Sequence, residues 1–155
     1  MSTFPWLSRE GEPSRRAETN RVKAERTRHR VLVADDNIDA AETLGMLLRL
    51  AGQEVVVAHG GVAAIEQALA HVPEIVLLDI GMPDLDGYEV CRRLRQEPST
   101  QNAVVIAVTG WGQDADRMRS RDAGFDHHFV KPVEWSTLEK LLAGLDRQSE
   151  PEGEA

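Results

Sequence analysis

The sequence is poor in cysteine and has no long apolar run. Its single cysteine, Cys91, excludes an intrachain disulfide and favours a reducing compartment. The longest uninterrupted apolar run, residues 103–108, is far too short to cross a membrane, and residues 1–7 are too short for a secretory signal. With 155 residues, 41% hydrophobic and 28% charged, the chain is typical of one soluble domain without disulfides or structural metal. We therefore expect a cytoplasmic protein.

Charge is unevenly distributed along the chain. The net charge is −8, but the first 30 residues hold eight Lys or Arg against four Glu, so they carry +4 and residues 31–155 carry −12. This acidic body argues against general nucleic-acid binding, for which only the basic N-terminal arm is suited. Residues 1–29 lack apolar periodicity and predict a flexible basic extension, residues 30–146 predict one domain, and residues 147–155 predict a disordered acidic tail.

Apolar residues between positions 30 and 146 alternate between two periods. Short β-branched runs predict strands over residues 30–34, 53–58, 74–79, 103–109 and 126–130. A helix is predicted after each of these runs, and apolar residues recur at helical spacing after the first, second and fifth. Such alternation with short connections implies right-handed βαβ units and a parallel sheet with helices on both faces. The predicted fold class is α/β, doubly wound, with five strands.

The predicted helices differ in their sequence signals. In the first helix, Asp39 and Glu42 resemble a capping box. Asp86 caps a later helix that runs to about residue 97, and Cys91 is expected in its core face. The segment 113–123 alternates charges and has few apolar residues, which predicts low local stability, as in a segment that rearranges. The residues expected to face the core are Leu44, Leu47, Leu48 and Ala51 in the first helix, Ile65, Ala68, Leu69 and Val72 in the second, and Leu138, Leu141, Leu142 and Leu145 in the last.

Polar side chains collect where the predicted strands end. In an open parallel sheet, the carboxyl ends of the strands share one edge, where ligands bind. Any one of these residues alone is more often a turn residue or a helix cap. Their number at one edge favours a common function. The set comprises Asp35 and Asp36 after the first strand, Asp79 at the end of the third, Thr109 at the end of the fourth, and Lys131 with Pro132 after the fifth.

The residue types in this set match phosphoryl chemistry. Three neighbouring carboxylates repel one another, which raises their pKa values. A hard divalent cation relieves this repulsion, and Mg²⁺ suits carboxylates together with water and a phosphate. A lysine ammonium and a threonine hydroxyl suit phosphoryl oxygens. The set therefore predicts phosphoryl transfer to a carboxylate beside Mg²⁺.

These residues lie in segments that resemble the receiver domain of two-component response regulators. The matching segments are VLVADDN at 31–37, IVLLDIGMP at 75–83, DG at 86–87, VTG at 108–110 and FVKP at 129–132. The resemblance covers about residues 29–146. It implies a flavodoxin-like sheet with strand order 2-1-3-4-5.

The resemblance also implies how the acidic residues act. Asp79 would accept a phosphoryl group from a phosphohistidine in a sensor histidine kinase or a histidine phosphotransfer protein. Mg²⁺ would be bound directly by Asp36, by Asp79 and by the backbone carbonyl of Gly81. Asp35 would assist largely through water.

The remaining matched residues would bind the phosphoryl group and report its presence. Thr109 and Lys131 would grip phosphoryl oxygens, and the small Gly110 would leave access to them. A cis bond before Pro132, a geometry favoured only before proline, would aim the loop of Lys131. Phosphorylation would draw Thr109 toward the phosphate and let His128 move inward. The surface formed by the segment 113–123, the fifth strand and the last helix would then change.

Three positions depart from the commonest pattern of the family. His128 stands where Tyr or Phe is more usual, which is similar to receivers that work with hybrid sensor kinases. With its neighbour His127 it suggests a metal site, but further ligands at suitable spacing are missing. Gly81 and Trp111 occupy the positions that tune dephosphorylation, and neither readily orients a water molecule. We therefore expect a slowly hydrolysing phosphoprotein.

Rival functions fit the sequence less well. A dehalogenase-like phosphatase would have a second Asp where Gly81 stands, and Gly60-Gly61 is neither a dinucleotide fingerprint nor a Walker A loop. A phosphate-independent scaffold would have lost an acidic residue, the threonine or the lysine. After Val130 only 25 residues remain, enough for a last helix and a tail but not for a DNA-binding output domain.

We therefore expect a single-domain response regulator, a signalling phosphoacceptor rather than an enzyme with a separate substrate. It would act on an unidentified protein target or serve as an intermediate in a phosphorelay. A phosphate-independent scaffold is the alternative. A homodimer through the segment 113–123, the fifth strand and the last helix is compatible with the same sequence.

Overall fold

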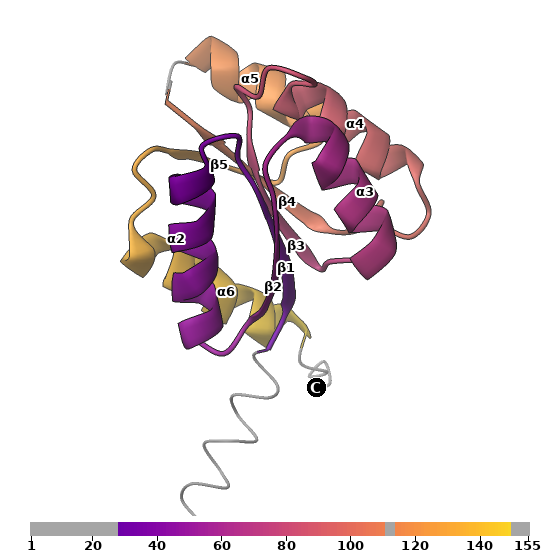
Figure 1. Ribbon diagram of the computed structural model, residues 1–155. Coiled ribbons are helices and arrows are strands. Elements are labelled where there is room, and N and C mark those ends of the chain that lie inside the picture. Colours follow the sequence, from indigo (N-terminus) through magenta and orange to yellow (C-terminus); the bar gives the residue numbers. More distant parts are fainter. Residues whose placement is uncertain (1–27, 111–113, 150–155) are drawn as a thin grey trace, which may run out of the picture.

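The computed structural model describes residues 28–110 and 114–149, which form alternating strands and helices (Figure 1). The predicted N-terminal extension lies almost wholly outside the described residues. No helix within the described ranges is both long and apolar enough to cross a membrane. The elements are β1 (Arg30–Ala34), α2 (Ile38–Leu50), β2 (Glu54–Ala58), α3 (Gly61–His71), β3 (Ile75–Asp79), α4 (Gly87–Gln96), β4 (Val104–Thr109), α5 (Asp114–Ala123), β5 (His127–Val130) and α6 (Trp135–Ser149).

The strands form one parallel sheet in the order β2-β1-β3-β4-β5, which confirms the predicted fold. All five residues of the central strand β3 are buried, whereas the edge strands β2 and β5 are only partly covered. Because β1 and β3 are neighbours although β2 lies between them in sequence, the chain reverses direction across the sheet there. The strand ends beside this reversal form the edge at which ligands bind in such folds.

Helices cover both faces of the sheet, and each face has its own core. On one face, α2 and α6 pack on Val33, Leu77 and Ile106. On the other face, α3, α4 and α5 pack on Leu78 and Ala107 (Figure 1). Alternate residues of each strand point to opposite faces, so the apolar strands predicted from sequence supply both cores. The predicted burial of Cys91 is confirmed.

The boundaries of α2 and its buried face differ from the prediction. Asn37, not Asp39, is the N-cap, and its side chain accepts the N–H of Ala40 at 3.1 Å. The buried residues of α2 are Ala41, Gly45 and Leu48, whereas the expected core residues Leu47 and Ala51 are exposed. The helix packs through its small residues because β2 lies very close, and a Cβ on Gly45 would stand 3.0 Å from a methyl group of Val57.

The buried face of α3 and the C-terminal end of α6 also differ from the prediction. In α3, Gly61, Ala64 and Ala68 are buried, and the expected core residues Leu69 and Val72 are exposed. The last helix, α6, continues to Ser149, three residues beyond the predicted end of the domain at 146. No proline interrupts it before Pro151, so the helical pattern has no reason to stop earlier.

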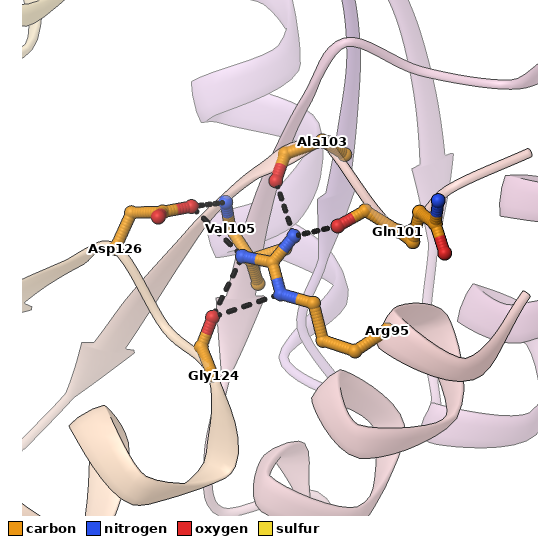
Figure 2. A network of polar contacts seen from close by, with 6 residues as sticks. All are labelled: Arg95, Gln101, Ala103, Val105, Gly124 and Asp126. Atoms are coloured by element: carbon orange, nitrogen blue, oxygen red, sulfur yellow. Dashed lines mark hydrogen bonds and ion pairs between the residues drawn. The ribbon is translucent and has the colours of Figure 1, made fainter. Parts of the chain in front are cut away.

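Arg95, near the C-terminal end of α4, ties three segments together at the amino edge of the sheet (Figure 2). Its guanidinium donates to the carbonyls of Gln101 (2.8 Å), Ala103 (2.6 Å) and Gly124 (2.6 and 3.0 Å). It also pairs with the carboxylate of Asp126 at 2.8 Å, and the same carboxylate oxygen accepts an N–H of β4 at 2.9 Å. This network, called here the Arg95 clamp, fixes the C-terminal end of α5 to α4 and β4.

Replacing Arg95 with methionine is expected to lower the free energy of unfolding by about 2 kcal/mol, because partly buried carbonyls and a carboxylate lose their donors. The matched control is Arg92→Met, which removes an exposed i,i+3 pair with Glu89 and should change stability by less than about 0.5 kcal/mol. Urea unfolding of both variants tests this. Equal stability of the two variants would show that the clamp is not a stabilising network.

Candidate phosphoryl and metal site

Four adjacent strands end in the polar residues that the sequence singled out. Asp35 follows β1, Asp79 and Thr109 are the last residues of β3 and β4, and Lys131 follows β5. The strand order places these ends side by side. The N–H of Lys131 donates to the carbonyl of Thr109 at 2.8 Å, which extends the β4–β5 pairing to the edge itself. The structure therefore gathers the predicted residues at one edge of the sheet.

Three carboxylates form the centre of this edge. One oxygen each of Asp35, Asp36 and Asp79 lies within 4.8 Å of the others. Asp35 and Asp79 are each only 7% exposed, whereas Asp36 is exposed to solvent. Two carboxylates also bind the backbone of their own turns: Asp35 accepts the N–H of Asn37 at 2.9 Å, and Asp79 accepts the N–H of Gly81 at 3.2 Å. These turns fix the direction of both side chains.

Lys131 joins the two buried carboxylates. Its Nζ lies 3.0 Å from Asp35 Oδ2 and 3.6 Å from Asp79 Oδ1. Burial alone would lower the pKa of Lys131, but the hydrogen bond to Asp35 and the negative charge of Asp79 outweigh burial and raise this pKa above its ordinary value. The ammonium therefore stays charged at neutral pH.

Asp79 is the carboxylate whose acidity the site changes most. Burial raises its pKa, and the nearby charge of Asp35 adds to this effect. The N–H of Gly81 and the ammonium of Lys131 act in the opposite direction. The resulting pKa is about 6, compared with an ordinary value of 3.8. Burial together with the charge of Asp35 thus outweighs the stabilisation of the ionised Asp79 by Gly81 and Lys131.

The donor set fits a hard divalent cation. It offers only oxygen ligands, and one of the three carboxylates is exposed to solvent, which leaves room for water. A cation would stabilise the ionised form of Asp79, which burial and, to a smaller extent, the charge of Asp35 disfavour. Mg²⁺ prefers such a partly hydrated site with one or two carboxylates.

Comparison with known proteins decides the family. Residues 31–143 match the model of the response regulator receiver domain. The chain belongs to this family. The receiver is 36% identical over 129 residues to the response regulator MprA of Mycobacterium avium, and this match covers 81% of the receiver chain and 54% of MprA. It is 32% identical over 114 residues to the DNA-binding dual master transcriptional regulator RpaA of Synechocystis, covering 74% and 46% of the two chains. The chain thus spans about half the length of the curated relatives it matches.

Solved structures agree with this assignment. A putative response regulator from Chloroflexus aurantiacus superposes with a TM-score of 0.71 at 31% identity, covering 77% of the receiver chain and 98% of its own. The receiver domain of a sensor histidine kinase from Pseudomonas aeruginosa gives a TM-score of 0.70 at 25% identity, with coverage of 77% and 98%. That structure contains a magnesium ion in its active-site cleft.

The loop after β3 lies against neighbouring backbone in a way that sequence analysis missed. A Cβ on Gly87 would stand 2.7 Å from the carbonyl oxygen of Asp79, so only glycine fits there. Asp84 in this loop accepts the N–H groups of Gly61 (2.9 Å) and Val62 (3.1 Å), and these bonds hold the pKa of Asp84 below its usual range. These bonds fix the loop after β3 to the start of α3. The pairing joins residues more than 20 positions apart, so no local pattern reveals it.

The remaining predicted site residues are Pro132, Gly110, His128 and Trp111, of which the structure describes the first three. The Lys131–Pro132 peptide bond is cis, as the resemblance implied. A Cβ on Gly110 would meet no atom of the described residues within 4 Å, so these residues leave the space at Gly110 open. His128 lies in β5, and its Nδ1 shares a hydrogen bond of 3.3 Å with Ser120 Oγ of α5. Trp111 lies outside the described residues of the receiver.

Proposed function

We propose that this receiver accepts a phosphoryl group on Asp79 from a phosphohistidine donor, with Mg²⁺ bound by Asp36, Asp79 and the carbonyl of Gly81. Asp35 assists, largely through water. The observation that carries this proposal is the carboxylate cluster, in which two buried acids share the ammonium of Lys131. A site of this composition is costly for folding unless it binds a cation and an anionic ligand.

The geometry supports in-line transfer to Asp79. Because the pKa of Asp79 is about 6, its carboxylate is mostly ionised at neutral pH and can act as the nucleophile. A bond forms between a carboxylate oxygen and phosphorus as the bond from phosphorus to the donor imidazole nitrogen breaks, and that nitrogen keeps the electron pair. Bound Mg²⁺ would supply charge neutralisation for the transferred group. Lys131 neutralises the same group from the other side, and Thr109 donates its hydroxyl hydrogen to a phosphoryl oxygen.

The surface beside the site is suited to a protein donor. A hollow of about 660 Å³ lies between α2 and the loop after β5, and Asp35, Leu47 and Lys131 are among its lining residues. Exposed apolar side chains continue along α2, with Met46 58% and Leu50 79% exposed. Such a stripe suits a helix of a partner protein. We propose that the sensor histidine kinase or phosphotransfer protein docks there and presents its phosphohistidine to Asp79.

Phosphorylation would signal through protein contacts. Thr109 and the neighbouring Gly110 lie between Asp79 on β3 and His128 on β5, so a movement of Thr109 toward a phosphoryl group reaches the edge strand directly. The receiver therefore acts as a signalling phosphoacceptor. Its acidic body favours a protein target over nucleic acid.

The chemical nature of the product tests this function. A phosphoryl group on a carboxylate is an acyl phosphate, which neutral hydroxylamine cleaves, whereas phosphoserine and phosphothreonine resist it. Protein incubated with labelled acetyl phosphate and Mg²⁺ should gain label that hydroxylamine removes. Absence of label, or label that survives hydroxylamine, would contradict the proposal.

We further propose that the phosphoryl group is long-lived. A Cβ at Gly81 would lie 4.0 Å from Asp79 Oδ1, so a side chain there would reach the phosphoryl group, and glycine offers none. Without an amide or carboxylate to orient water, the half-life should be minutes or longer. Gly81→Asn should shorten it by about 100-fold, the lower end of the range for positioned general acid–base catalysis. Label loss after removal of donor measures this, and equal half-lives would exclude a role for this position.

A further inference from the structure

The side chains of α5 that the structure describes are those of residues 118–123, and few of them are buried. Among its residues 118–123, only Ser120 and Ala123 are buried. Arg119 lies over the ring of Tyr88 on α4, 4.2 Å from the ring centre. Because residues 118–123 bury little apolar surface, individual polar contacts contribute strongly to the position of this part of the helix.

The C-terminal end of α5 is firmly fixed. Gly124 has a left-handed φ of +106° and closes the helix. Its N–H donates to the carbonyl of Arg121, and the N–H of Phe125 donates to the backbone carbonyl of Ser120, both at 3.0 Å. The Arg95 clamp holds the carbonyl of Gly124 at the amino edge of the sheet (Figure 2). This edge is opposite to the one that carries Asp79. Any displacement of α5 during signalling must therefore be larger toward its N-terminal end.

Ser120 links α5 to β5, the strand that contains His128. Its side chain is buried, 2% exposed, and its Oγ lies 3.3 Å from Nδ1 of His128. The register pairs His128 with Ala107 on β4, and Ala107 lies two residues before Thr109, on the same face of the strand. Ala107 and Thr109 are both buried, 0% and 4% exposed, so both lie beneath the helices that cover this face. The imidazole of His128 is thus placed between a partner on α5 and the phosphoryl-binding residue on β4.

We propose that Ser120 is a positioning residue that stabilises the unphosphorylated state. Its hydrogen bond to His128 is called here the latch. This bond holds the imidazole against α5 and holds α5 against β5. When phosphorylation draws Thr109 toward the acceptor, His128 turns toward Ala107, the bond to Ser120 breaks, and α5 shifts about its clamped C-terminal end. This inference rests on the proposed function, because phosphorylation of Asp79 supplies the force that opens the latch.

A latch and a merely structural contact make different predictions. A contact that only supports the fold stabilises α5 in both phosphorylation states. A latch that opens on phosphorylation stabilises α5 only in the unphosphorylated state. Removal of the Ser120 hydroxyl should then affect one state and not the other.

The test is amide hydrogen exchange of the full chain for wild type, Ser120→Ala and the control Ser136→Ala, an exposed serine on α6. Each protein is measured with Mg²⁺ alone and after loading with acetyl phosphate, with the loaded fraction read by intact mass. Without donor, Ser120→Ala should exchange about fivefold faster than wild type in peptides covering 114–123 and 127–130, the factor that one ordinary hydrogen bond provides. Loaded wild type and loaded Ser120→Ala should exchange alike, and Ser136→Ala should match wild type in both states.

The outcomes separate the latch from the proposed function. Unchanged exchange of Ser120→Ala without donor, or an equal acceleration in both states, would overturn the latch. His128→Phe should reproduce the acceleration without donor, and the double variant should exceed neither single variant, because both remove one bond. Additive effects of the two substitutions would also overturn it. Failure of wild type to gain a phosphoryl group would instead overturn the proposed function, while the measurement without donor still decides whether the bond holds α5.

Discussion

Chelation of divalent cations with EDTA is expected to slow phosphoryl uptake from acetyl phosphate by at least about 100-fold. The site brings three carboxylates within 4.8 Å of one another and sets the ammonium of Lys131 against them. An incoming phosphoryl group adds further negative charge, which one lysine does not neutralise. Uptake is measured by intact mass at fixed times, and added Mg²⁺ in excess of EDTA should restore the rate.

A matched pair of variants locates the cation. Asp36 belongs to the carboxylate cluster and is exposed, whereas Asp39 lies in the first turn of α2 outside that cluster. Asp36→Ala should raise the Mg²⁺ concentration for half-maximal uptake by at least about tenfold, and Asp39→Ala should leave it nearly unchanged. Uptake that is insensitive to EDTA, or equally impaired in both variants, would rule out the proposed metal site.

Replacing Asp79 with asparagine is expected to stabilise the protein at neutral pH in the absence of Mg²⁺. The pKa of Asp79 is about 6 in the folded state and has an ordinary value of 3.8, a difference of about two units or about 3 kcal/mol. The asparagine side chain carries no charge, so the Asp79→Asn variant avoids this cost. Urea unfolding in EDTA at pH 7.5 should show an unfolding free energy about 2 to 3 kcal/mol above that of the wild type.

The pH dependence of this gain has a definite sign. Well below pH 3.8 the side chain of Asp79 is protonated in both the folded and the unfolded state, so it does not affect stability. Between pH 4 and about 6 the folded state binds more protons than the unfolded state, and stability falls as pH rises. The difference between variant and wild type should therefore grow from near zero at about pH 3 to its full value above pH 7. A difference in unfolding free energy that is constant with pH would show that the pKa of Asp79 is not raised in the folded state.

The fold could be predicted because its signals are local and repeated. The five apolar strands match the predicted ranges to within one residue at each end, and the strand ends carry the acidic, threonine and lysine residues together. The parallel order brings Asp79, Thr109 and Lys131 to one edge without any further information. Sequence reasoning was therefore sufficient to locate the candidate site.

Features that depend on packing distance could not be predicted. Leu47 and Leu69 are exposed because α2 and α3 approach the sheet largely through glycine and alanine, with Leu48 the large side chain that α2 buries. Asn37 and Asp39 are both good N-cap residues, and the backbone of the preceding turn decides between them. The Ser120–His128 bond joins two elements whose relative position only the folded chain defines. Such pairings carry no periodic signal.

The most direct test of the account is the intact mass of wild type and Asp79→Asn after incubation with Mg²⁺ and acetyl phosphate, followed by peptide mapping. The account predicts that the wild type gains one phosphoryl group, that the group maps to the peptide containing Asp79, and that the variant gains none. Equal gains in both proteins, or no gain in wild type that demonstrably binds Mg²⁺ and has been offered a phosphorylated histidine donor, would contradict it.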